Sequence, residues 1–392
     1  MKVLLAAVRF FNAKMRLIKC LGIGLACIFT SQAQAVFCEF SSLITNDISI
    51  PVIGLGISTA SEDVPVGKVL YSQTYTPALN TVRSISCTVS DEEAVAGLSF
   101  TKHEYVKFTT ISTPSGPAIK SGGQDIFPTN ISGVGAIFYI SGINPNYTSF
   151  PSVWDDSYTI GIGTSSRTMT MFNRVKIELI KTGPIPAGYQ QVEGSSFPTF
   201  QISSGLYSPT PMNNVFVNLN FVGSTTIHTK TCQLATANID VNLGNHAVGD
   251  FTSPGTVTEW KDFDIVLQGC PPFYGYGNYT YNGRTDELTG SNADNVISIG
   301  LQSANGVIEG NPSLAKLDAG TNAATGIGIE LSQRNISGSI PLDGSGGFNL
   351  TNLTQQDNAT YTIPLKARYV QSDANVTAGP ANGSVVFTIT YL

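Results

Sequence analysis

Apolar and polar positions alternate along this chain in short runs that are typical of β-strands. The clearest run lies at the carboxyl end, where apolar and aromatic residues occupy every second position from Val385 to Tyr391. Period-two alternation of β-branched and aromatic residues predicts a half-buried strand. Gly379 and Pro380 break the backbone ahead of this strand. Because a terminal strand is ordered only when it is tied down, we expect it to need a partner.

The same pattern recurs through the rest of the sequence, between clusters of glycine, proline, asparagine and serine. The predicted strands cover residues 70–76, 82–89, 105–111, 136–140, 168–172, 175–180, 215–222, 237–244, 263–270, 295–301, 326–332, 361–370 and 385–391. No long helix and no periodic repeat stand out. Many short strands between turns predict an all-β sandwich or barrel.

The chain is long enough for two domains, each with its own core. It has 392 residues, of which 12% are charged and 39 are glycine, and lengths of this order usually divide into two units. The short flexible run from Gly223 to Thr226 is the best candidate for a boundary. We therefore expect two immunoglobulin-like or jelly-roll β-sandwich domains in tandem, over residues 36–222 and 228–392, with a linker at 223–227.

The amino-terminal residues 1–35 are predicted to be a signal peptide. Basic residues precede an apolar stretch from Leu21 to Phe29, and Ala33-Gln34-Ala35 fits a signal-peptidase site. Met15 is an alternative start for this signal. The formal charge of −6 becomes more negative once this basic segment is removed. An acidic surface repels phosphate backbones, so we expect no nucleic-acid partner.

Four cysteines remain after the signal, namely Cys38, Cys87, Cys232 and Cys270. Four cysteines allow three pairings. Two early and two late positions favour Cys38–Cys87 and Cys232–Cys270, one disulfide in each domain, as suits an exported protein. No C-x-x-C motif is present, and the three histidines lie far apart in sequence, so we expect no metal site.

Residues 231–392 resemble the pilin domain of chaperone–usher fimbriae. The resemblance rests on motifs in the family's order, which are Cys232, Asp264–Cys270, Ala324–Leu331, Pro364–Tyr369 and the terminal strand with its penultimate tyrosine and Gly379. The resemblance implies an immunoglobulin-like sandwich that lacks its last strand. Such a domain has a hydrophobic groove and open edges that a partner strand can fill.

This resemblance also implies partners and docking residues. A periplasmic chaperone would fill the groove first, and an adjacent fimbrial subunit would then donate its amino-terminal strand, with assembly at an outer-membrane usher. The residues expected to dock are Gly379, Val385, Phe387, Ile389, Tyr391 and Leu392. Val36-Phe37-Cys38 leaves no donor segment before the first cysteine, so we expect the chain at the tip of a cell-surface fimbria, reached through the periplasm.

The first domain resembles the receptor-binding domain of type 3 fimbrial adhesins. The motifs that carry this likeness are Asp63–Val69, Thr74–Thr76, Cys87, Gly133–Phe138 and Val175–Thr182. The likeness implies a host-surface ligand, either a glycan or a matrix protein such as collagen. It does not choose between these two ligands.

The stretch from Asn144 to Thr159 combines aromatic, acidic and amide side chains on a predicted loop. The candidate ligand-binding residues are Asn144, Asn146, Tyr147, Phe150, Trp154, Asp155, Asp156 and Tyr158. Aromatic faces and hydrogen-bonding groups on loops above a rigid sandwich are common binding elements. In the alternative interpretation, Phe150 and Trp154 are core anchors and the acids are solvated.

Two other functions compete with the fimbrial tip adhesin. The first is a structural fimbrial subunit without a receptor. The second is a secreted β-sandwich enzyme acting on carbohydrate, with Asp155 and Asp156 as paired carboxylates. Adjacent acids on a strand face opposite ways, and the sequence has no H-E-x-x-H, G-x-S-x-G or phosphate-binding loop. We therefore expect non-covalent binding, with no catalysis and no cofactor.

Overall fold

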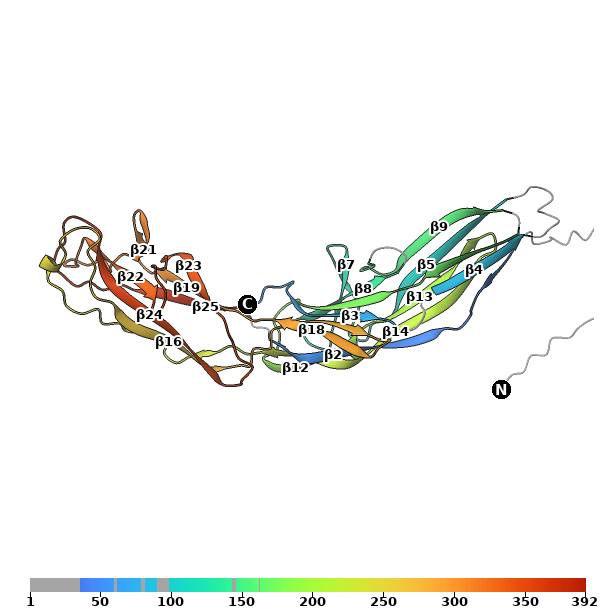
Figure 1. Cartoon of the computed structure of the whole chain (residues 1–392), viewed down its shortest axis with the longest axis horizontal. Helices are drawn as coiled ribbons and strands as arrows, with labels where there is room; N and C mark the ends of the chain where they lie inside the picture. Colours follow the sequence, from blue (N-terminus) through green and yellow to red (C-terminus); the bar gives the residue numbers. More distant parts are fainter. Residues whose placement is uncertain (1–35, 60–61, 79–81, 90–98, 143–145, 162) are drawn as a thin grey trace, which may run out of the picture. The chain divides into compact units, whose positions relative to one another are not determined.

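The protein is built almost entirely of β-strands, which confirms the predicted all-β sandwich fold. The computed structural model describes residues 36–59, 62–78, 82–89, 99–142, 146–161 and 163–392 (Figure 1). The predicted signal peptide lies outside these residues. Two short 3₁₀ turns, Gly194–Ser196 and Val248–Asp250, interrupt the strands. No helix in the described ranges has the length and apolar character needed to cross a membrane.

Three sheets form the first half of the chain, residues 36–229. The β5 sheet contains β12 (Gly188–Glu193), β14 (Met212–Thr229), β13 (Thr199–Ser208), β5 (Phe100–Ser112) and β9 (Ser152–Ile160), in that order, with β2 (Asn46–Thr59) parallel to β14. The β4 sheet contains β1 (Val36–Phe40), β4 (Val82–Val89) and β10 (Gly163–Thr170). The β3 sheet includes β3 (Val69–Thr76), β11 (Arg174–Lys181), β8 (Val134–Ser141), β7 (Gln124–Pro128) and β6 (Ile119–Ser121).

A phenylalanine cluster fills the core between these sheets. Phe138 lies 5.1 Å from Phe200 and 4.9 Å from Phe221 between ring centroids. Phe127 meets Phe200 edge-on at 5.8 Å, a favourable geometry for aromatic pairs. The Cys38–Cys87 disulfide joins β1 to β4, as predicted.

Two further sheets form the second half, residues 230–392. The β24 sheet contains β15 (Gln233–Leu234), β16 (Lys261–Cys270), β24 (Ala359–Gln371), β22 (Ile327–Gln333), β21 (Asn311–Ala315) and β20 (Val307–Ile308). The β19 sheet contains β23 (Asp343–Leu350), β19 (Ile297–Ser303) and β25 (Val385–Tyr391). Their inward side chains form one apolar cluster, and Cys232–Cys270 is disulfide-bonded, as predicted.

The two halves of the chain share a sheet. Residues 223–227, the predicted linker, lie inside the continuous strand β14, which ends at Thr229. A hairpin from the second half, β17 (Tyr276–Asn282) and β18 (Glu287–Ala293), joins the β3 sheet because β17 pairs in parallel with β3. The domain boundaries themselves remain a prediction.

Tyrosines hold this hairpin against β3. Tyr281 stacks on Tyr75 with 6.0 Å between centroids, and Tyr279 meets Tyr71 at 5.8 Å. Tyr276 is 9% exposed, and its burial raises the pKa of the phenol from 10.0 to about 12. The folded chain therefore keeps this proton at a pH where the unfolded chain has lost it.

We predict that alkaline pH destabilises the wild-type chain more than a Tyr276→Phe variant. Because the folded pKa lies above the unfolded one, the stabilising contribution is complete below about pH 10 and is lost as the pH rises toward 12. The urea midpoint of the variant should fall less steeply across this window. Tyr189→Phe, at a site that is 58% exposed, is the matched control. Parallel slopes for all three proteins would contradict the prediction.

Candidate functional site

A groove with a volume of about 740 Å³ opens in the second half. One wall is the segment 237–243 and the other is the chain from Ala381 to Phe387. Its floor includes Ile265 of β16, Leu331 of β22 and Leu365 of β24. Protein interiors rarely contain voids larger than a water molecule. A groove of this size over the core of a sandwich therefore has the room for an additional strand.

The first wall, residues 237–243, has the alternation of a strand but is paired with no described strand. Ile239, Val241 and Leu243 pack on the apolar cluster, while the residues between them are exposed. We predicted a strand over 237–244, and that prediction is wrong, since the segment joins no sheet in the described part of the chain. A strand requires a hydrogen-bonded neighbour, and the groove occupies that neighbour's position.

The second wall leads into the terminal strand β25, which the sequence predicted correctly. On one side β25 pairs antiparallel with β19, where Phe387 lies opposite Leu301 and Ile389 opposite Ile299. Val385, Phe387, Ile389 and Tyr391 pack on the core, as expected. Among the described strands, β25 is an edge strand of the β19 sheet (Figure 1). An edge strand beside an apolar groove is a template for strand addition.

The last residues of the chain are held by specific contacts. The Tyr391 hydroxyl accepts a hydrogen bond from the Cys232 amide at 3.0 Å, and its ring lies parallel to that of Phe273. Burial raises the pKa of Tyr391. Leu392 exchanges backbone hydrogen bonds with Val296 at 2.8 and 2.9 Å. At Gly379 a side chain would overlap the Asn322 carbonyl, so close backbone approach requires glycine there.

The structure separates the candidate residues predicted on the loop at 144–159. Asn144 lies outside the described residues. The side chain of Asn146 accepts a hydrogen bond from Ser141, and Tyr147 stacks on Phe108 at 4.4 Å. Phe150 is 6% exposed and belongs to the phenylalanine core, so the core interpretation is correct for this residue.

The second part of the predicted loop is strand β9 instead. The physical reason is the alternation of Trp154, Asp156 and Tyr158, which are half-buried, with exposed neighbours. The strand pairs with β5 along its length. Asp155 and Asp156 therefore face opposite ways, so they do not form the paired carboxylates of a glycosidase.

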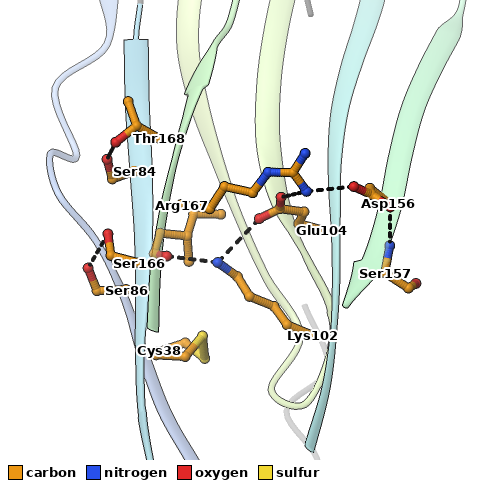
Figure 2. A network of polar contacts seen from close by, with 12 residues as sticks. Cys38, Ser84, Ser86, Lys102, Glu104, Asp156, Ser157, Ser166, Arg167 and Thr168 are labelled. Carbon is orange, nitrogen blue, oxygen red and sulfur yellow. Dashed lines mark hydrogen bonds and ion pairs between the residues drawn. A yellow bond between two sulfur atoms is a disulfide. The ribbon is translucent and has the colours of Figure 1, made fainter. Parts of the chain in front are cut away.

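Asp156, on the inner face of β9, belongs to a charged network with Arg167, Glu104 and Lys102 (Figure 2). One Arg167 nitrogen lies 2.5 Å from Asp156 and 3.2 Å from Glu104. Glu104 is also 3.2 Å from the Lys102 ammonium, which donates to the Ile85 carbonyl at 2.7 Å. The side chains of Lys102 and Glu104 have no exposed surface. Lys102, Glu104 and Arg167 are not among the residues predicted from the sequence.

This network has equal numbers of positive and negative groups, and its arginine packs on the two aromatic candidate residues of β9. The Arg167 guanidinium lies 5.5 Å from the ring centres of both Trp154 and Tyr158, within cation–π range. Its hydrogen bond to Asp156 lowers the pKa of that carboxyl group and raises the pKa of Arg167. Two cations and two anions leave no net charge for an ionic ligand. We interpret the inner-face residues as a structural link between β9 and β10.

Comparisons with known proteins identify the family to which this chain belongs. The family model described as "Fimbrial protein" matches residues 220–392. A type-1 fimbrial protein subunit of Serratia marcescens is 31% identical over 194 residues, which cover 47% of this chain and 92% of the relative. The chain therefore belongs to the fimbrial protein family.

A second relative extends the similarity to the first half. A fimbria adhesin protein of Klebsiella pneumoniae is 24% identical over 382 residues, which cover 94% of this chain and 98% of that protein. The predicted resemblance to fimbrial adhesins is thus confirmed over nearly the whole length. Among solved structures, the CupB6 tip adhesin of Pseudomonas aeruginosa matches 90% of this chain and 94% of its own, with 15% identity and a TM-score of 0.35.

Proposed function

We propose that this chain is a fimbrial tip adhesin whose second half receives a strand from a partner protein. The groove between the segment 237–243 and β25 carries this proposal. It combines an apolar floor, a strand-like wall without a pairing partner in the described residues, and an edge strand. These are the three features that strand addition requires.

The inserted strand would act in two ways. Its backbone would pair with β25, and its alternate side chains would enter the groove above Ile265, Leu331 and Leu365. A periplasmic chaperone would supply this strand first, and the amino-terminal segment of the next fimbrial subunit would replace it at the outer-membrane usher. The mature protein would then stand at the tip of a cell-surface fimbria.

The first half would bind the host. Similarity to a fimbria adhesin protein across both halves supports a receptor-binding role for residues 36–222. A host-surface glycan or a matrix protein is the ligand that we infer. Binding of this kind is non-covalent and needs neither a cofactor nor catalysis.

Removal of Tyr391 and Leu392 is expected to weaken the complex with the fimbrial chaperone. The deletion breaks the hydrogen bond from the Cys232 amide and the backbone pairing with Val296, so the end of β25 frays. The measurement is co-purification from the periplasm, with and without the chaperone. Tyr391→Phe is the control, because it keeps the ring on Phe273 and loses only the hydroxyl.

The proposal also predicts that the untrimmed full chain accumulates in much larger soluble amounts when the chaperone is co-expressed. Equal soluble accumulation with and without the chaperone would contradict the incomplete sandwich. Equal chaperone retention by the trimmed and intact chains would contradict the docking role of the last two residues.

A further inference from the structure

The outward face of the β5 sheet carries a cluster of aromatic and polar side chains. The tyrosine platform, as we call it, consists of His103, Tyr105, Asp155, Tyr207 and Asn213. The ring centroids of Tyr105 and Tyr207 lie 4.5 Å apart, and His103 meets Tyr207 edge-on at 4.8 Å. The members come from β5, β9, β13 and β14, so the surrounding sheet fixes their positions.

A glycine makes room for this arrangement. Tyr105 lies opposite Gly205 on the neighbouring strand, and a Cβ at Gly205 would come within 2.5 Å of the Tyr105 hydroxyl. The Tyr105 ring therefore lies across the backbone of β13. Its hydroxyl donates a hydrogen bond to the side-chain oxygen of Asn213 at 3.0 Å. The ring is thus held in place before any ligand arrives, which lowers the entropic cost of binding.

The rim of the platform offers hydrogen-bonding groups to solvent. The Asp155 carboxylate lies 3.0 Å from His103 Nε2, and the two side chains are 55% and 35% exposed. Tyr207 is 49% exposed. This face contrasts with the inner face of β9, where Arg167 covers the aromatic rings. Here an exposed ring, a carboxylate and an amide stand together.

We propose that the tyrosine platform is a glycan-binding site of the receptor-binding half. The C–H face of a pyranose would lie on Tyr207, while its hydroxyls would donate to Asp155 and accept from the Asn213 amide. Polyproline-type peptides such as collagen dock into slots between aromatic rings. Tyr105 and Tyr207 pack on each other and leave no such slot, which favours a sugar.

This inference rests on the proposed adhesin function, and its test separates the two. The full chain is applied to an array of immobilised glycans that end in hexose, N-acetylhexosamine or sialic acid, and to collagen-coated wells. Tyr207→Ala should weaken glycan binding by roughly tenfold or more, the loss of one stacked aromatic contact. Asp155→Asn should weaken it as well, whereas Tyr207→Phe should retain it.

Tyr189→Ala is the matched control, since Tyr189 is also an exposed strand tyrosine beside a histidine, 4.1 Å from His228. It should bind like the wild type. Glycan binding that is insensitive to Tyr207 and Asp155 would overturn the platform and leave the adhesin function standing. Binding to collagen alone would also overturn the platform. Binding to neither surface would count against both proposals.

Discussion

Replacement of Glu104 by glutamine is expected to destabilise the first half of the chain by about 3–5 kcal/mol, the usual cost of removing one partner from a buried ion pair. Glu104 is fully buried and lies 3.2 Å from both Lys102 and Arg167. Glutamine keeps the shape of the side chain and removes its charge. Lys102 then remains buried without a carboxylate partner, with its ammonium still donating to the Ile85 carbonyl.

The two tryptophans of the chain allow a selective measurement. Trp154 lies beside Arg167 in the network, and Trp260 lies in the second half against Arg368. In a Trp260→Phe background, fluorescence during urea unfolding reports on the first half alone.

Two controls separate charge burial from lost packing. Asp156→Asn changes the exposed end of the network and should cost no more than about 1 kcal/mol. A Lys102→Met/Glu104→Met double variant removes both buried charges together and should recover most of the loss. A Glu104→Gln variant as stable as Asp156→Asn would show that the buried pair contributes little.

A donor strand fused to Leu392 through a flexible Gly/Ser linker is expected to stabilise the second half by about 4 kcal/mol. This figure assumes a micromolar Kd for the strand and a millimolar effective concentration from the linker. The strand would alternate isoleucine and threonine, so that isoleucines enter the groove above Leu331 and Leu365. Urea unfolding followed by Trp260 fluorescence, in a Trp154→Phe background, measures the gain.

A fused strand of the same length with serine in place of isoleucine is the matched control. It offers the same backbone but cannot fill the groove, so it should dock only weakly beside β25 and its gain should be small. A groove variant, Leu331→Lys, places a charge on the floor and should abolish the gain from the isoleucine strand. Equal stability of the two fusions would show that apolar filling of the groove is not the source.

Local alternation predicted the strands well where each strand has a described neighbour. The predicted bounds 82–89 coincide with β4, and residues 385–391 coincide with β25. The segment 237–244 has the same alternation and forms no ladder, because pairing depends on a neighbour that a single sequence segment does not contain. Residues 223–227 have the composition of a flexible linker, yet they lie within strand β14, which pairs there with β12.

The buried charged network on β5, β9 and β10 was harder to predict than the strands, because charged residues are usually exposed. Lys102 and Glu104 lie on the same buried face of β5 as Val106 and Phe108, while the residues between them are exposed or half-buried. This alternation was the one sequence signal that could have predicted their burial. Arg167 is far from both in sequence. The cluster of Tyr105, Tyr207 and Asn213 likewise depends on strand pairing over long sequence separations, so only the sheet brings it together.

The most direct test of strand addition is backbone hydrogen exchange along β25 in the two fusion proteins. In the isoleucine fusion, we expect the amides from Val385 to Tyr391 to exchange much more slowly than in the serine fusion, because the strand becomes paired on both sides and the groove is closed to water. Unchanged exchange along β25 in the isoleucine fusion, even with a rise in overall stability, would contradict an acceptor groove at this edge.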